Sequence, residues 1–310
     1  METAIKSKNY SQIQSSKAEP TVKIGNENFD TFFSAPGGLV LPSVILMTGS
    51  SGAGKTTMAK HIQKNLSSHK SSIYLRESPE SQVNTQTIGI KIEHGNDYVC
   101  DQESCATFSD YVNELDKLKP SVVFIDSLQV IAKEDFSDMN EDDAIYYIIK
   151  VMRKWAHENS AVVFLIGHVN KDDGFKGANT LMQMVDGHLE LIYNKKENFR
   201  TLSWGQKNRK GDATKMLYYE FVVENNLVTG FDFLTQKEFE LKDKKVKFDD
   251  YLLKTIVEFA NSVNKKNPSY ASFKKEYNEK IKTLDTKKSK FEIVVEIAKI
   301  VNELTTKYEL

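Results

Sequence analysis

The sequence predicts an α/β protein with a mostly parallel central sheet, antiparallel strands at one edge and a small helical C-terminal region. Between about residues 36 and 230, short apolar runs alternate with amphipathic stretches, which is the pattern of βαβ units. The runs at 44–48, 122–126 and 161–167 are almost continuously apolar. Such runs are typical of parallel strands that are covered on both faces.

The start and end of each apolar pattern predict the bounds of the individual strands and helices. We expect buried strands at 44–48, 72–75, 122–126 and 161–167, helices at 55–66, 108–118 and 143–157, and shorter antiparallel strands at 188–193, 201–204 and 217–223. Glu141 and Asp142 favour a helix that begins beside them, because acidic side chains interact well with the positive end of the helix dipole. Three further helical segments are expected between 250 and 308.

The length of the chain and the composition along it predict four segments. Its 310 residues fit one large domain and a smaller appendage, and 40% apolar with 27% charged residues is ordinary for a globular protein. We expect a flexible N-terminal arm at 1–30, an α/β domain at 31–230, a charged linker at 231–249 and a helical C-terminal domain at 250–310.

Charge, cysteine content and hydropathy argue against several classes of protein. A net charge of −1 gives no overall basic field, so nucleic-acid binding would need a local patch or the inside of a ring. Cys100 and Cys105 are too few for a disulfide framework or a four-cysteine zinc site. No apolar run approaches the ~20 residues of a membrane span. The N-terminus lacks the apolar segment of a signal peptide, so we expect a cytoplasmic protein without membrane contact.

One octapeptide carries the strongest chemical signal. Residues 49–56 (GSSGAGKT) match G-x-x-x-x-G-K-[ST] in full, after an apolar strand and at the start of a helix. In this context the main-chain N–H groups and the helix N-terminus bind phosphate, and the lysine reaches the β- and γ-phosphates. The predicted ATP contacts are Gly49, Ser50, Ser51, Gly52, Ala53, Gly54, Lys55, Thr56 and Thr57. The alternative is a glycine-rich turn that binds nothing.

A magnesium ion bound with ATP needs oxygen ligands from the protein. The Thr56 hydroxyl is one, and Asp126, which ends the apolar run 122–125, is the other. In α/β sheets ligands bind at the carboxyl ends of the strands, which is where this acid stands. An acid at the end of a strand is common, so the prediction depends on the pairing of Asp126 with the phosphate loop.

Four segments resemble a known family. Residues 36–46 (PGGLVLPSVIL), 166–171 (IGHVNK), 184–186 (MVD) and 207–211 (KNRKG) resemble, in order and spacing, the RadA (Sms) DNA-repair ATPases of the RecA-like superfamily. The last segment is also similar to the K-x-R-x-G stretch of DnaB-type replicative helicases. The resemblance covers about residues 30–225 and implies a RecA-like P-loop fold.

The chain also departs from the RadA pattern. It has no N-terminal four-cysteine zinc module, and Lys210 stands where the family has an aromatic residue. The last ~80 residues look helical rather than like the family's Lon-protease-like domain. We therefore expect an ATPase core with a different tail.

The resemblance implies two catalytic positions beside the nucleotide. Glu77 resembles the helicase glutamate that orients the attacking water, whereas Glu80 matches the RadA version after a shift of the alignment. His168 matches the position that senses the γ-phosphate and communicates with the DNA loop. The alternatives are a solvated loop acid and a histidine without a role.

Lys207 and Arg209 are two residues apart on an expected strand, so both side chains point to the same face. In the family that face enters the nucleotide site of the neighbouring subunit, where a cationic pair stabilises charge on the phosphoryl group. Hydrolysis would then depend on assembly. The alternative is an exposed basic edge strand.

Two loops would face the axis of a ring, at 127–140 and 169–179. In the second, Lys171 and Lys176 could neutralise phosphates and Phe175 could stack on a base, although neighbouring acids oppose this. We therefore expect an ATP- and Mg²⁺-dependent ATPase that acts on single-stranded DNA in recombination, repair or replication as a hexameric ring. A regulatory or assembly ATPase acting on protein partners is the first alternative, and a small-molecule kinase the second.

Overall fold

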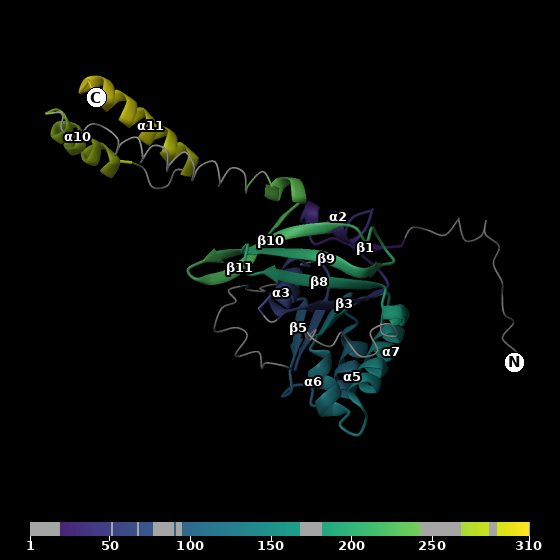
Figure 1. The fold of residues 1–310 in the computed structure, drawn as a ribbon. Helices are drawn as coiled ribbons and strands as arrows, with labels where there is room; N and C mark the ends of the chain where they lie inside the picture. Colours follow the sequence, from purple (N-terminus) through teal and green to yellow (C-terminus); the bar gives the residue numbers. More distant parts are fainter. Residues whose placement is uncertain are drawn as a thin grey trace, which may run out of the picture. The chain divides into compact units, whose positions relative to one another are not determined.

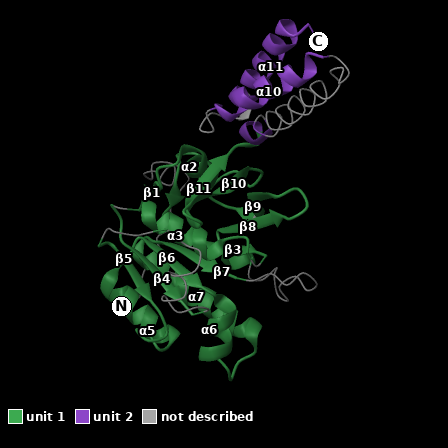
Figure 2. Ribbon diagram, turned by 90° about the vertical axis from the view of Figure 1, so that its left-hand side faces the viewer, with its two compact units in different colours: residues 1–236 green, residues 237–310 purple. Residues whose placement is uncertain are grey.

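A computed structural model describes residues 19–50, 52–66, 68–76, 90, 95–167, 182–240, 242, 268–284 and 290–309. The chain divides into two compact units, residues 1–236 and 237–310 (Figure 2). Glu77, Glu80, His168 and the predicted DNA contacts Lys171, Phe175 and Lys176 lie outside the described residues, as does Ser51.

The first unit contains a nine-stranded sheet in the order β11-β10-β9-β8-β3-β7-β6-β4-β5 (Figure 1). Strands β8, β3, β7, β6, β4 and β5 are parallel, and β8 through β11 pair in antiparallel fashion. Their bounds are β3 Ser43–Gly49, β4 Ser71–Leu75, β5 Asp97–Cys100, β6 Val122–Asp126, β7 Val162–Ile166, β8 Gly187–Asn194, β9 Phe199–Asn208, β10 Met216–Glu224 and β11 Leu227–Leu234. This arrangement confirms the predicted fold class.

Helices cover both faces of the parallel strands. Their bounds are α3 Lys55–Asn65, α5 Phe108–Leu118, α6 Leu128–Asp135 and α7 Glu141–Asn159. Ile45 and Met47 of β3 point into the core that α3 closes, whereas Val44 and Leu46 point into the core of α5, α6 and α7. Burial on both faces explains why the strand sequences are apolar throughout.

The first strand in the described part of the chain starts at Thr21, inside the segment that the sequence indicated as an arm. Strand β1 (Thr21–Val22) pairs with β2 (Leu39–Val40), and α2 (Glu27–Phe33) lies over the antiparallel strands (Figure 1). The Phe32 ring stacks on Trp204, and the Phe29 ring lies 4.4 Å from that of Phe233. Aromatic burial therefore fixes a short helix that has little periodicity of its own.

Strands β5 and β11 were not among the predicted elements. Both lie at the edges of the nine-stranded sheet, and several of their side chains are only partly buried. An edge strand does not need the continuous apolar sequence of a central strand, so its signal is weak.

The second unit contains α10 (Tyr270–Lys282) and α11 (Lys290–Lys307). Val294, Ile297 and Val301 form its small core, against which Tyr277 and Ile281 pack. Within the described residues, none of the helices has the length and hydropathy needed to cross a membrane.

Candidate nucleotide-binding site

The phosphate loop joins the carboxyl end of β3 to the first turn of α3. Gly54 precedes the helix with φ of 93°, a left-handed conformation that glycine adopts without strain. A Cβ at this position would lie 2.9 Å from Phe221 Cζ, so the aromatic packing of β10 also requires a glycine here. A Cβ on Gly49 would lie 2.3 Å from the Leu191 carbonyl oxygen of β8. The loop therefore needs glycine for its backbone and for its close contacts with the sheet.

Two polar contacts hold the loop, one from a residue at its end and one from β10. The Lys55 ammonium donates to the Gly49 carbonyl at 2.9 Å, across the span of the loop. The Tyr219 hydroxyl, from the buried face of β10, donates to the Ala53 carbonyl at 2.6 Å. Tyr219 was not among the sequence candidates, because only the packing of β10 against the loop brings it there.

The proposed magnesium ligands lie together. The Thr56 hydroxyl donates to Asp126 Oδ2 at 2.5 Å, although the two residues are 70 positions apart. Asp126 ends β6 and is 3% exposed. A hydroxyl and a carboxylate are hard oxygen donors of the kind that Mg²⁺ prefers, with phosphate oxygens and water completing the coordination. In the part of the chain that the structure describes, no group of three or more His, Cys, Asp or Glu could hold a metal.

The described strand ends border this site. Leu75 of β4 is paired with Asp126, and the Arg76 N–H donates to the Asp126 carbonyl at 2.7 Å. On the other side, the Gly167 N–H donates to the Met47 carbonyl of β3 at 2.9 Å. Arg76 and Gly167, the last described residues of these two segments, therefore lie at the edge of the sheet that carries the phosphate loop.

Lys207 and Arg209 make contacts within their own chain. Lys207 Nζ donates to the Met182 carbonyl at 2.5 Å, and Arg209 Nη2 donates to the Gln183 carbonyl at 3.2 Å. Arg209 Nη1 also lies 3.5 Å from Asp186 Oδ1. Burial lowers the pKa of Lys207, and the neighbouring Arg209 charge lowers it further. Lys207 lies in β9 and Arg209 one residue beyond its end, and both side chains donate to the Gln183 carbonyl. A role toward a neighbouring nucleotide remains a prediction.

A buried histidine lies beside the start of the loop. His188 of β8 is 5% exposed, and its Nε2 is 2.8 Å from the hydroxyl of Thr48, the residue before Gly49. Burial lowers the pKa of His188 to about 4, so the ring is neutral at physiological pH. A Cβ at Gly205 would lie 2.5 Å from His188 Nδ1, so β9 needs a glycine opposite the ring. Nothing in the sequence singled out this histidine.

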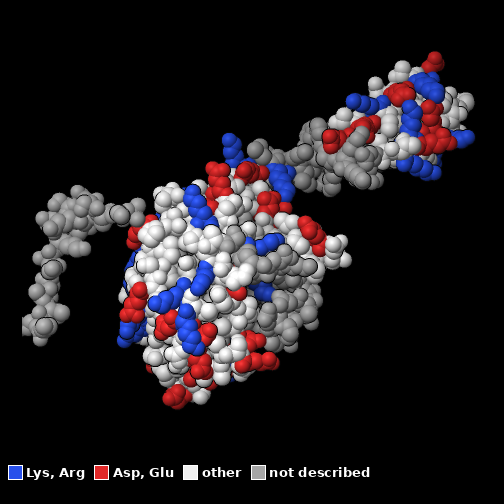
Figure 3. Space-filling model, turned by 180° about the vertical axis from the view of Figure 1, so that it is seen from behind, with Lys and Arg blue, Asp and Glu red and all other residues white. Residues whose placement is uncertain are grey.

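Surface charge is mixed on the face shown in Figure 3. Among the residues that are drawn in colour there, Lys and Arg lie interspersed with Asp and Glu. This distribution matches the near-zero net charge of the chain.

Known proteins match the α/β unit. A model of the ATPase family associated with various cellular activities (AAA) matches residues 45–191. The DNA repair protein RadA of Bacillus subtilis is 26% identical over 205 residues, which are 65% of this chain and 43% of that protein. RadA of Haemophilus influenzae is 26% identical over 182 residues, which are 58% of this chain and 39% of that protein. The chain thus spans about two fifths of the length of these curated relatives.

The fold has a counterpart among solved structures. The crystal structure of a KaiC-like protein from the archaeon Pyrococcus horikoshii superposes with a TM-score of 0.56 at 19% identity, covering 70% of this chain and 99% of that one. At this identity the likeness concerns the fold alone, which is RecA-like. The resemblance to RadA-type ATPases that the sequence indicated is confirmed.

Proposed function

We propose that this chain binds ATP with Mg²⁺, hydrolyses it, and acts on single-stranded DNA in recombination, repair or replication. The observation that carries the ATPase proposal is the convergence of Lys55, Thr56 and Asp126 at one end of the parallel sheet. A phosphate loop and a metal-binding acid in this arrangement fit a nucleoside triphosphate.

Each residue has a distinct role in the proposed reaction. Lys55 binds the β- and γ-phosphates, and Thr56 and Asp126 hold Mg²⁺, which neutralises charge on the phosphates when bound. Glu77, or Glu80 as the alternative, orients the attacking water, and His168 senses the γ-phosphate. The assignments of Glu77 or Glu80 and of His168 rest on the family resemblance.

Assembly would complete the site. We propose that the chain forms a hexameric ring in which Lys207 and Arg209 leave their contacts at Met182 and Gln183 and approach the neighbouring nucleotide. A cationic finger of this kind contributes about 10³-fold or more to turnover. ATPase activity per chain would then rise with protein concentration.

The DNA part of the proposal is supported by the relatives named as DNA repair proteins. Lys171, Phe175 and Lys176 are the proposed contacts. Steady-state ATP hydrolysis should be measured at low salt with and without single-stranded DNA, for the wild type, for Lys55→Ala and for the surface control Lys117→Gln. We expect DNA-stimulated turnover in the wild type and the control, and none in Lys55→Ala. Turnover that single-stranded DNA does not change would refute the DNA assignment and leave the ATPase.

A regulatory or assembly ATPase acting on proteins is the second candidate, favoured by the net charge of −1 and the mixed-charge face. Electrophoretic mobility shifts of labelled single-stranded DNA at two salt concentrations separate the two candidates, because phosphate contacts make binding salt-dependent. Absence of any shift at low salt, with ATPase activity intact, would favour the protein-directed function.

A further inference from the structure

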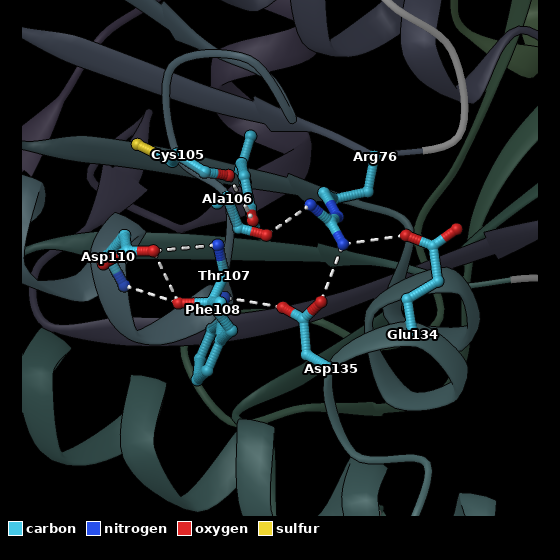
Figure 4. A network of polar contacts seen from close by, with 9 residues as sticks. Arg76, Cys105, Ala106, Thr107, Phe108, Asp110, Glu134 and Asp135 are labelled. Atoms are coloured by element: carbon cyan, nitrogen blue, oxygen red, sulfur yellow. Dashed lines mark hydrogen bonds and ion pairs between the residues drawn. The ribbon is translucent and has the colours of Figure 1, made fainter.

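Arg76 is a buried charge at the carboxyl end of β4. Its side chain is 2% exposed, and its guanidinium contacts two other parts of the domain (Figure 4). Nη2 donates to Glu134 Oε2 and to Asp135 Oδ1, each at 2.7 Å, and Nη1 donates to the Ala106 carbonyl at 3.0 Å. Because a buried charge is costly unless it is paired, these partners hold the side chain in one place.

The two acidic partners differ in environment. The Asp135 side chain is 6% exposed, and its Oδ2 also accepts the N–H of Phe108, the first residue of α5, at 2.6 Å. The Glu134 side chain is 44% exposed. Burial raises the pKa of Asp135, against the opposing effects of the Phe108 N–H and the Arg76 charge. Asp135, at the end of α6, therefore connects that helix to Arg76 after β4 and to the start of α5. The ion pair of Arg76 with Glu134 is weaker, because solvent screens an exposed carboxylate.

The main chain of Arg76 reaches the proposed magnesium site. Leu75 is the last residue of β4 and lies opposite Asp126 of β6. The N–H of the next residue, Arg76, donates to the Asp126 carbonyl at 2.7 Å. Asp126 precedes α6, and Asp135 ends α6. Arg76 thus binds both ends of the segment 126–135, one with its backbone and the other with its side chain.

We propose that Arg76 is a positioning residue for the metal-binding acid, holding the backbone of Asp126 through its anchor on Asp135 and the start of α5. This role rests on the proposed function, because it requires Asp126 to be the magnesium ligand. Groups that orient a metal ligand without touching the metal typically affect metal affinity by about 10- to 100-fold.

Three substitutions separate positioning from general stability. Arg76→Lys keeps the charge and loses the planar fork that reaches three acceptors. Asp135→Asn removes the inner anchor, and Glu134→Gln is the matched control at the exposed partner. The affinity of the full chain for Mn²⁺ should be measured by electron paramagnetic resonance with a non-hydrolysable ATP analogue. The affinity for a fluorescent ATP analogue should be measured separately in EDTA.

We expect Arg76→Lys and Asp135→Asn to weaken Mn²⁺ binding by about 10-fold or more, with metal-free nucleotide affinity unchanged. Glu134→Gln should change Mn²⁺ affinity less than about fivefold, as expected for an exposed pair. Wild-type Mn²⁺ affinity in a folded Arg76→Lys chain would overturn the proposal. An equal loss of both affinities, or an unfolded Arg76→Lys chain, would overturn it too, because either result shows a general structural role. If the wild type itself binds no Mn²⁺–nucleotide, the proposed function has failed instead.

Discussion

Replacing His188 with glutamine tests how burial beside the phosphate loop affects a titratable group. The imidazole is 5% exposed, and its Nε2 is 2.8 Å from the Thr48 hydroxyl. Among the described residues, Nδ1 has no hydrogen-bond partner, so a proton added there would remain unpaired. The Glu190 carboxylate lies beside the ring, with Oε1 at 3.8 Å from Nε2. A glutamine amide can reach Thr48 but does not titrate.

The expected effect follows from the two pKa values. Burial lowers the pKa of His188 to about 4 in the folded chain, whereas an unfolded histidine has a pKa of about 6.5. Below pH 6.5 the unfolded state therefore binds a proton that the folded state does not, and stability falls as the pH falls toward 4. At pH 5 this linkage amounts to about 2 kcal/mol relative to pH 8.

Urea unfolding followed by tryptophan fluorescence measures this effect. Both tryptophans, Trp155 and Trp204, lie in the first unit, so the signal reports that unit alone. Between pH 8 and pH 5 we expect the wild type to lose about 2 kcal/mol more than His188→Gln. The same substitution at His157, exposed on α7, controls for the loss of an imidazole as such. Equal losses in the wild type and His188→Gln would refute the reasoning.

Three further predictions concern the phosphate loop and the cationic pair. Gly49→Ala places a Cβ against the main chain of β8 and should lower the unfolding free energy by about 1–3 kcal/mol in urea titrations, whereas Gly95→Ala, with no atom within 4 Å of its Cβ, should not. Tyr219→Phe leaves the Ala53 carbonyl without its donor, so we expect a loss of about 1–3 kcal/mol in stability and weaker ATP binding by calorimetry. Arg209→Ala should lower ATP turnover by about 10³-fold with ATP affinity retained, and normal turnover in a stopped assay would count against the finger role.

Local sequence was sufficient to predict the phosphate loop and the buried strand that precedes it. The loop requires glycines, a lysine and a hydroxyl at adjacent positions, so its chemistry is complete within eight residues. Asp126 was predictable because a buried parallel strand that ends in an acid delivers it to the same sheet edge. Its contact with Thr56 follows from that placement.

Contacts between distant segments that carry no motif could not be predicted from the sequence. His188 lies beside Thr48 only because β8 pairs with β3 in a register that places Leu46 opposite His188. Arg76 forms its ion pair with Asp135 across a sequence separation of 59 residues. The Asn28 amide donates to the Phe233 carbonyl across a separation of 205 residues. Side chains of this kind have no neighbours in sequence that reveal their partners, so tertiary packing decides their roles.

The central claim is that the loop of Lys55, with Thr56 and Asp126, binds ATP together with Mg²⁺. Isothermal titration calorimetry of the full chain with a non-hydrolysable ATP analogue and Mg²⁺ tests it most directly. We predict saturable binding at one site per chain in the wild type, weaker binding in EDTA, and none in folded Lys55→Ala. A folded wild-type chain that releases no heat of binding at any accessible nucleotide concentration would contradict the account.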